Sequence, residues 1–200
     1  MVKIRLYIFL LIGLVAGSGL SAFLILSFQT KPLCTCASTI ELAEDSIIPV
    51  TNREFFEVTD AALRSASSSI HIVMFEMKYY TSEEYANSTT NLLLKDLIDA
   101  KARGVDVKII LDEYGDMYGR SYASQVIEYL EQNGIEDIKL DGSKTTTHCK
   151  LLIIDGEIVI VGSTNWSYYA LDRNNEANVL IKSKEAAQEF EEYFEQIWNQ

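Results

Sequence analysis

Four polar side chains suited to binding and attacking a phosphate ester lie near the ends of one expected β-hairpin. The apolar residues that follow His148 and Lys150 predict a buried strand, and the Asp-Gly pair at 155–156 predicts a tight turn into a returning strand. A two-residue loop places His148 opposite Ser163, with Asn165 just past the strand end. An imidazole, an ammonium, a hydroxyl and an amide, with no carboxylate between them, provide a nucleophile or base and three donors for an oxyanion. The spacing therefore predicts a phosphate pocket.

The alternation of side chains along this strand assigns each neighbour to a face of the sheet. His148 and Lys150 share one face, while Cys149 points to the other, where core packing is its expected role. The same two-residue loop sets Lys150 opposite Val161. The catalytic candidates are therefore expected on a single face, at one edge of the sheet.

The complete pattern H-x-K-x4-D-x6-G-S-x-N resembles the signature of the phospholipase D superfamily. Its defined positions are His148, Lys150, Asp155, Gly162, Ser163 and Asn165. The downstream Glu176 resembles the trailing acidic position of that family. A single motif in a chain of this size resembles the bacterial nuclease-like and mitochondrial cardiolipin-hydrolase-like members, although a zinc-binding insert is not recognisable. The resemblance implies a phospholipase D-like α/β sandwich and the hydrolysis of phosphodiesters.

The resemblance also implies a role for each polar residue. His148 would be the nucleophile and would form a covalent phosphohistidine. Lys150 and Asn165 would hold the non-bridging phosphate oxygens, with support from Ser163. Glu176 would accept a hydrogen bond from the far ring nitrogen of the histidine and fix its tautomer. Neither a metal nor a cofactor is expected, because the ammonium and the amide supply the positive charge.

A single motif has one imidazole, whereas the implied chemistry uses two. The only other histidine, His71, lacks a lysine two residues later and is expected to be a packed histidine of the sheet. The second imidazole would protonate the leaving group. The chain is therefore expected to form a homodimer with a shared active site, in which the partner subunit's His148 is the general acid.

Two motif positions and three neighbouring aromatic residues have structural interpretations. Asp155 is expected to be structural, because an aspartate-glycine pair suits the backbone of a tight turn, and Gly162 is likewise a structural position of the motif. Trp166, Tyr168 and Tyr169 would either border a substrate groove or cap the core. These two readings remain open at the level of sequence.

Helical and strand patterns alternate from about residue 49 onward. This alternation predicts an α/β fold with a mixed, largely parallel central sheet flanked by helices. The expected helices lie at 54–66, 91–104 and 124–134, and the expected strands before the hairpin at 69–77, 105–113 and 135–140.

The N-terminus contains an uncharged run that is long enough to cross a membrane. At about 1.5 Å per residue, a helix over residues 6–28 would span a hydrocarbon core of about 30 Å. Lys3 and Arg5 precede it, which favours a cytoplasmic N-terminus and an extracytoplasmic catalytic domain. A cleaved signal peptide is the alternative. The expected organisation is a basic flank at 1–5, an anchor at 6–28, a juxtamembrane linker at 29–48 and a catalytic domain at 49–200.

Two linker cysteines have several possible fates. Cys34 and Cys36 could be palmitoylated, could form an intermolecular disulfide, or could remain free thiols.

The charge of the chain bears on its substrate. The 17 basic and 29 acidic residues give a formal net charge of −12, which argues against a broad nucleic-acid-coating surface. Phospholipid is therefore the favoured substrate, and a metal-independent endonuclease acting on DNA or RNA is the alternative. A metal-dependent hydrolase built on Asp112, Glu113 and Asp116 is a weaker alternative, because no histidine accompanies them. A non-catalytic membrane scaffold is the weakest, because the motif is intact.

Overall fold

The structure, a computed structural model, describes residues 43–113, 123–142 and 146–200. The expected anchor at 6–28 and the linker cysteines Cys34 and Cys36 lie outside these ranges. Among the residues that are described, no helix is long and apolar enough to cross a membrane.

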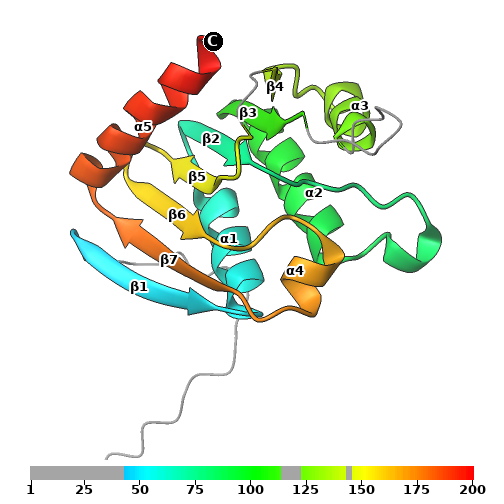
Figure 1. Cartoon of the computed structure of the whole chain (residues 1–200), viewed down its shortest axis with the longest axis horizontal. Helices are drawn as coiled ribbons and strands as arrows, with labels where there is room; N and C mark the ends of the chain where they lie inside the picture. The colour runs from blue at the N-terminus through cyan, green and yellow to red at the C-terminus, as the bar shows by residue number, and fades with distance from the viewer. Residues whose placement is uncertain (1–42, 114–122, 143–145) are drawn as a thin grey trace, which may run out of the picture. The chain divides into compact units, whose positions relative to one another are not determined.

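The core of the domain is a seven-stranded mixed sheet with the strand order β1-β7-β6-β5-β2-β3-β4 (Figure 1). Its strands are β1 Ser46–Thr51, β2 Ser69–Met74, β3 Asp106–Asp112, β4 Ile138–Asp141, β5 Lys150–Ile154, β6 Ile158–Gly162 and β7 Ala177–Lys182. The pairs β2–β3 and β3–β4 are parallel, whereas β1–β7, β7–β6, β6–β5 and β5–β2 are antiparallel. The prediction of a mixed sheet is confirmed, but the prediction that it is largely parallel is wrong.

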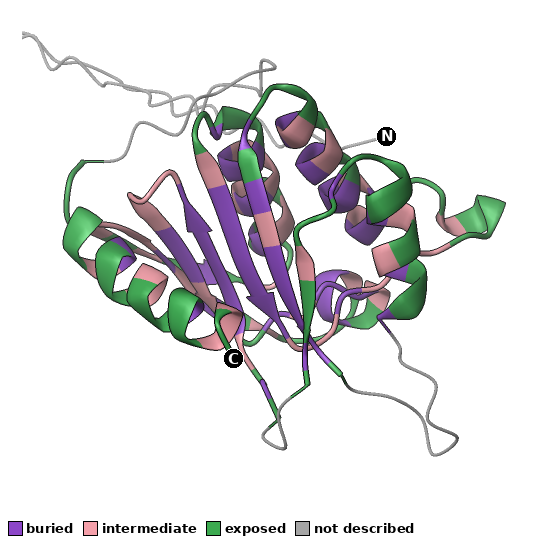
Figure 2. Ribbon diagram, turned by 90° about the horizontal axis from the view of Figure 1, so that it is seen from above, coloured by how far each residue is buried: buried purple, intermediate pink, exposed green. Residues whose placement is uncertain are grey.

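Helices cover both faces of this sheet. They are α1 Glu54–Ser65, α2 Thr89–Ala102, α3 Ser124–Gln132, α4 Tyr168–Asp172 and α5 Lys184–Trp198, with a short 3₁₀ helix, η1, at Glu83–Tyr85. The three helices expected from the sequence correspond to α1, α2 and α3. Figure 2 shows the buried strands between α5 on one side and the remaining helices on the other.

Alternation along the strands divides the buried residues between two apolar cores. On β2, Ile72 belongs to the larger core shared with α1, α2 and α3, while Val73 belongs to the smaller core under α5. On β5, Leu152 and Ile153 divide in the same way. Phe194 of α5 is fully buried over the smaller core. The central strands therefore read as continuous apolar runs because both of their faces are covered.

The β5–β6 hairpin differs by one residue from the pairing expected for a two-residue loop. Asp155 and Gly156 have φ values of 54° and 63°, and the N–H of Glu157 donates to the carbonyl oxygen of Ile154 at 3.0 Å, as expected for a tight turn. However, Ile154 pairs with Ile158, so Glu157 is an extra residue between the turn and the ladder.

This shift keeps His148 and Lys150 on one face of the sheet, but it moves the β6 side chains to the face opposite the expected one, so that Val161 packs against the smaller core under α5. Val161 lies opposite Leu151, whereas the sequence analysis expected it opposite Lys150. The paired ladder ends at that position, so His148 and Ser163 both lie beyond it, and the expected direct pairing of these two residues is absent.

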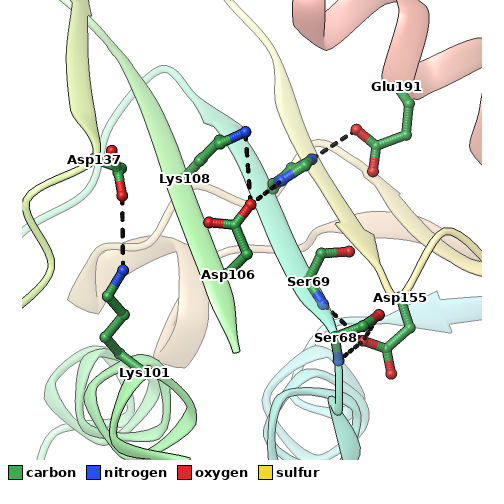
Figure 3. Close-up of polar contacts among 9 residues, drawn as sticks. Ser68, Ser69, Lys101, Asp106, Lys108, Asp137, Asp155 and Glu191 are labelled. Atoms are coloured by element: carbon green, nitrogen blue, oxygen red, sulfur yellow. Dashed lines mark hydrogen bonds and ion pairs between the residues drawn. The ribbon is translucent and has the colours of Figure 1, made fainter. Parts of the chain in front are cut away.

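Asp155 fastens this hairpin to the start of β2. Its carboxylate accepts hydrogen bonds from the backbone N–H groups of Ser67, Ser68 and Ser69, and from the hydroxyls of Ser67 and Ser68. Figure 3 shows Asp155 beside Ser68 and Ser69. Burial raises the pKa of the Asp155 carboxyl, but the hydrogen bonds from the serine backbone outweigh it and hold the pKa below its usual value. The geometry agrees with a structural role for this motif position.

We expect Asp155→Asn to weaken the fold and to flatten its acid dependence. Since the folded pKa lies below the unfolded value of about 3.9, the carboxylate stabilises the fold above that pH, and this contribution is lost as the pH falls through the folded pKa. At pH 7 the variant should lose about 1–3 kcal/mol of unfolding free energy. Urea unfolding between pH 2 and pH 7 measures both effects, and equal pH slopes for the two proteins would contradict the assignment.

Candidate active site

The sheet topology brings all the predicted polar residues to one edge. Because β2, β3 and β4 are parallel, their C-terminal ends share an edge. Since β5 runs antiparallel to β2, it starts at that edge, where β6 then ends and β7 starts. His148 and Lys150 at the start of β5, Ser163 and Asn165 after β6, and Glu176 before β7 therefore gather at the same place. This edge is the candidate active site.

The side chains of His148 and Lys150 form a hydrogen-bonded pair. The Lys150 ammonium nitrogen lies 3.1 Å from Nδ1 of His148 and donates to the carbonyl oxygen of His148 at 3.0 Å. Lys150 is only 6% exposed, whereas His148 is exposed to solvent. The same ammonium nitrogen lies 3.3 Å from Nε2 of His148, so Lys150 is within hydrogen-bonding distance of both ring nitrogens, and this contact does not select a tautomer.

An aromatic ring that the sequence did not single out covers this pair. The centre of the Phe75 ring lies 4.9 Å from the Lys150 ammonium and 4.4 Å from the centre of the His148 ring. Burial lowers the pKa of Lys150, although the negative charges of Glu176 and Glu76 act in the opposite direction. Phe75 and Glu76 follow β2 directly, and only the β2–β5 pairing, which is remote in sequence, reveals that they lie beside the motif.

Ser163 and Glu176 form a second pair. The Ser163 hydroxyl donates to Oε2 of Glu176, and the side-chain amide of Asn174 donates to Oε1 at 3.1 Å. The backbone N–H of Ala177 donates to the Ser163 hydroxyl oxygen at 3.1 Å. The carboxylate of Glu176 is therefore directed at the serine in this structure. A bond from Glu176 to the ring of His148 stays a prediction.

A buried asparagine that the sequence analysis missed orders the loop after β6. The side chain of Asn178 accepts from the Thr164 N–H at 3.2 Å and donates to the Thr164 hydroxyl at 2.8 Å. Gly162 precedes this loop, and a Cβ there would clash with the Asn178 side chain, which explains why the motif needs glycine. Next to Thr164, the Oδ1 atom of Asn165 is buried and has no hydrogen-bond partner in the described part of the chain.

The remaining predicted neighbours fall into structural positions. Cys149 lies on the opposite face from His148, and its Sγ is 3.3 Å from the Tyr193 hydroxyl of α5. Trp166 is completely buried in the larger core, so it caps the core and does not border a groove. Tyr169, by contrast, is 69% exposed.

His71 is packed in the sheet, as expected. Its ring stacks on Phe194 with 4.7 Å between the ring centres, and its Nδ1 lies 2.6 Å from a Glu191 carboxylate oxygen. Asp106 lies on the other side of the ring, 3.6 Å from Nε2. This histidine therefore links β2 to α5 on the face opposite the candidate active site.

The acidic residues considered for a metal site have other surroundings. Asp112 is 8% exposed and accepts a hydrogen bond from the N–H of Thr147 at 2.6 Å. Glu113 is exposed, and Asp116 lies outside the described residues. No group of three or more histidine, cysteine, aspartate or glutamate side chains in the described ranges is arranged to hold a metal ion.

Comparison with known proteins places this geometry in a family. The family model "Cardiolipin synthase, PLD-like domain" matches residues 60–198. Similar curated proteins include a phospholipase D of Rickettsia conorii, 36% identical over 101 residues, which are 50% of this chain and 47% of that protein. A mitochondrial cardiolipin hydrolase of Mus musculus is 29% identical over 140 residues, 70% of this chain and 56% of that one. A probable cardiolipin synthase of Bacillus subtilis, YwiE, is 32% identical over 98 residues, 48% of this chain and 19% of that protein.

Solved structures show the same fold. Nuc of Salmonella typhimurium, a phospholipase D family member, superposes with a TM-score of 0.66 at 28% identity, covering 78% of this chain and 96% of that one. NucT of Helicobacter pylori gives a TM-score of 0.55 at 18% identity, over 77% of this chain and 97% of that one, and supports the fold alone. The chain spans roughly half or less of the curated relatives named above. On the family match over residues 60–198 and the motif at the sheet edge, the chain belongs to the phospholipase D superfamily, which includes phosphodiester hydrolases such as phospholipase D and cardiolipin hydrolase.

Proposed function

We propose that the chain is a membrane-anchored phosphodiesterase of the phospholipase D type that acts on phospholipid through a covalent phosphohistidine. The observation that carries the proposal is the His148–Lys150 pair, in which a buried ammonium lies within 3.3 Å of both ring nitrogens of an exposed imidazole. This arrangement places a cation where a phosphate would bind, beside an exposed ring. Attack through Nε2 requires the ring proton on Nδ1, which is the tautomer that the proposed hydrogen bond to Glu176 would favour.

The proposed reaction has two displacements. In the first, Nε2 of His148 attacks the phosphorus, an N–P bond forms, and the P–O bond to the leaving alcohol breaks. In the second, water attacks the same phosphorus, the N–P bond breaks, and a phosphomonoester leaves. Lys150 and the side-chain amide nitrogen of Asn165 donate to the non-bridging oxygens and hold them. Ser163 supports them, and Glu176 fixes the tautomer of the histidine.

The leaving alcohol needs a proton, and the proposed donor is a second imidazole. His71 is packed under α5 on the opposite face of the sheet, so it is unsuited to this task. The proposal is therefore a homodimer in which the partner subunit's His148 protonates the leaving oxygen and later accepts a proton from water.

Mixed dimers test this arrangement. Wild-type and His148→Ala chains with different tags are co-expressed, and the doubly tagged dimers are purified. Because each reaction needs both imidazoles, these dimers should have less than about 5% of the activity of doubly tagged wild-type dimers. Half of the wild-type activity would show that each subunit works alone, and a fully active monomer in sedimentation would rule out the shared site.

Phospholipid is the proposed substrate for two reasons. Similar proteins are named cardiolipin hydrolase and phospholipase D, and the net charge of −12 opposes the approach of a polyanion. The specific observation that favours a nuclease instead is the fold match to Nuc, which covers 96% of that chain. The second candidate function is therefore a metal-independent endonuclease.

A substrate panel separates these candidates. The full chain in detergent micelles is incubated with cardiolipin, phosphatidylcholine, single-stranded DNA and RNA, each with and without EDTA. We expect phospholipid hydrolysis that EDTA does not reduce. Cleavage of nucleic acid alone would establish the endonuclease, and activity that is lost with EDTA and restored by a divalent ion would overturn the metal-independent mechanism.

The proposed location is a single-pass membrane protein with an extracytoplasmic catalytic domain. It rests on the uncharged run at 6–28 and on Lys3 and Arg5 before it. Protease treatment of intact cells should remove the domain, whereas protection until the membrane is breached would reverse the orientation. A mature chain that begins near residue 20–30 would turn the anchor into a signal peptide.

A further inference from the structure

The segment that carries His148 crosses the ends of two strands before it enters the sheet. The order β5-β2-β3-β4 separates β4 from β5, so the ends of β3 and β2 lie between the end of β4 at Asp141 and the start of β5 at Lys150. With about 4.8 Å between neighbouring strands, this crossing covers on the order of 14 Å. His148 lies within it, before the first ladder residue, so strand pairing does not fix its position.

Two buried carboxylates hold the residue that precedes His148. The N–H of Thr147 donates to Oδ2 of Asp112 at 2.6 Å, and the Thr147 hydroxyl donates to Oδ2 of Asp141. Asp112 and Asp141 face each other as register partners on β3 and β4, and they are only 8% and 9% exposed. Hydrogen bonds to carboxylates are stronger than neutral ones, particularly where water is excluded. Thr147 is therefore anchored through both its backbone and its side chain.

The residues after Thr147 are anchored to other elements. The carbonyl oxygen of Cys149 accepts a hydrogen bond from the N–H of Phe75 at 2.8 Å, just past the end of β2. Lys150 donates to the carbonyl oxygen of His148 itself at 3.0 Å. His148 thus sits between one anchor at the ends of β3 and β4 and a second at the end of β2.

We propose that Asp112 and Asp141 are positioning residues of the active site. Acting through Thr147, they determine where the backbone of His148 leaves the sheet edge and hence the direction in which its imidazole points. The inference rests on the proposed role of His148 as the nucleophile. It gives Asp112 a task different from the metal ligation that its sequence neighbourhood suggested.

Substitution of Thr147 tests the hydrogen bond from its hydroxyl to Asp141. Thr147→Val keeps the shape of the side chain and removes the donor to Asp141, whereas Thr147→Ser keeps the donor. We expect kcat to fall about tenfold to a hundredfold in the valine variant, with KM within about twofold of wild type, because a misdirected nucleophile slows chemistry more than binding. Thr147→Ser should retain near wild-type kcat. The matched control is Thr146→Val, the same change at the exposed neighbouring threonine.

A milder variant covers the case in which Thr147→Val does not fold. Asp141→Asn keeps the shape of the acceptor but removes its charge, and it should lower kcat several-fold without a matching change in KM. Where Thr147→Val folds, combining it with Asp141→Asn shows whether the two residues act together, because the two effects should not multiply if they share one hydrogen bond.

An NMR measurement separates this inference from the proposed function. The chain has two histidines, so the ring signals of His148 and His71 can be assigned with a single His148→Ala spectrum. In Thr147→Val the His148 signals should shift or broaden while those of His71 stay in place, whether or not the wild-type protein hydrolyses any tested substrate. An inactive wild type would defeat the proposed function alone. A valine variant with wild-type kcat and unchanged His148 signals would overturn the inference.

Discussion

His148→Ala is expected to reduce phosphodiester hydrolysis to below about 1% of the wild-type rate while the domain stays folded, because the variant lacks the atom that bonds to phosphorus. The imidazole is exposed, so its removal leaves no cavity in the core. Lys150→Met should have a loss of similar size, since it keeps the buried stem and removes the cation held against Nδ1 of His148. Initial rates on the preferred substrate, with thermal unfolding of each variant, measure both effects.

The control for the lysine is Lys95→Met, because Lys95 is an exposed residue of α2. It should have wild-type activity. More than a few per cent of the wild-type rate in a folded His148→Ala protein would refute the nucleophile assignment. The lowered pKa of Lys150 adds a second signature, because the cation is lost at a lower pH than for a free lysine. The alkaline decline of kcat/KM should therefore occur at a pH below the ordinary lysine pKa of about 10.4.

Gly162→Ala is expected to be the most destabilising small substitution near the site. The added Cβ would clash with the Asn178 side chain and would lie 2.6 Å from both the carbonyl oxygen of Ala177 and the Cα of Asn178. Since two of these are backbone atoms, β6 and β7 must separate to make room. This separation would break the Thr164–Asn178 hydrogen bonds. Forced overpacking of this kind costs about 1–3 kcal/mol, which lowers Tm by roughly 2–12 °C in a domain of this size.

A matched substitution isolates the steric cause. Gly142→Ala adds the same methyl group where no atom of the described residues lies within 4 Å, so its Tm should change little. Hydrolysis should also fall in Gly162→Ala below the melting temperature. Ser163 directly follows β6 and Glu176 directly precedes β7, so separating these strands also separates the two side chains. Equal Tm values for the two alanine variants, measured by thermal unfolding, would show that the close approach at Gly162 is not real.

The sequence by itself determined the elements and the chemistry of the motif. The helical period at 54–66 and the continuous apolar runs of β2 and β5 reflect local patterns of burial, and such patterns are visible without any partner. The motif spacing likewise placed His148 and Lys150 on one face, because side chains alternate along an extended chain whatever its neighbours are.

The directions and registers of the strands were decided by tertiary structure. Alternating helices and strands correctly suggested the parallel β2–β3–β4 set, but β5 pairs with β2 in the antiparallel sense, and this depends on contacts between residues about 80 apart. The extra residue Glu157 shifts the hairpin by one position, and the Asp-Gly turn is compatible with either register. The β1 strand begins at Ser46, inside the expected linker. The sequence did not reveal this strand, because β7, with which it pairs, lies more than a hundred residues away.

The surroundings of the motif also depended on the fold. Phe75 reaches the His148–Lys150 pair from the end of β2, and Asp112 and Asp141 hold Thr147 from the ends of β3 and β4. A sequence states which residue types are present and how far apart they lie along the chain. Which distant strand ends share an edge is set by the order and direction of strands across the whole sheet, because that arrangement is what buries both of its faces.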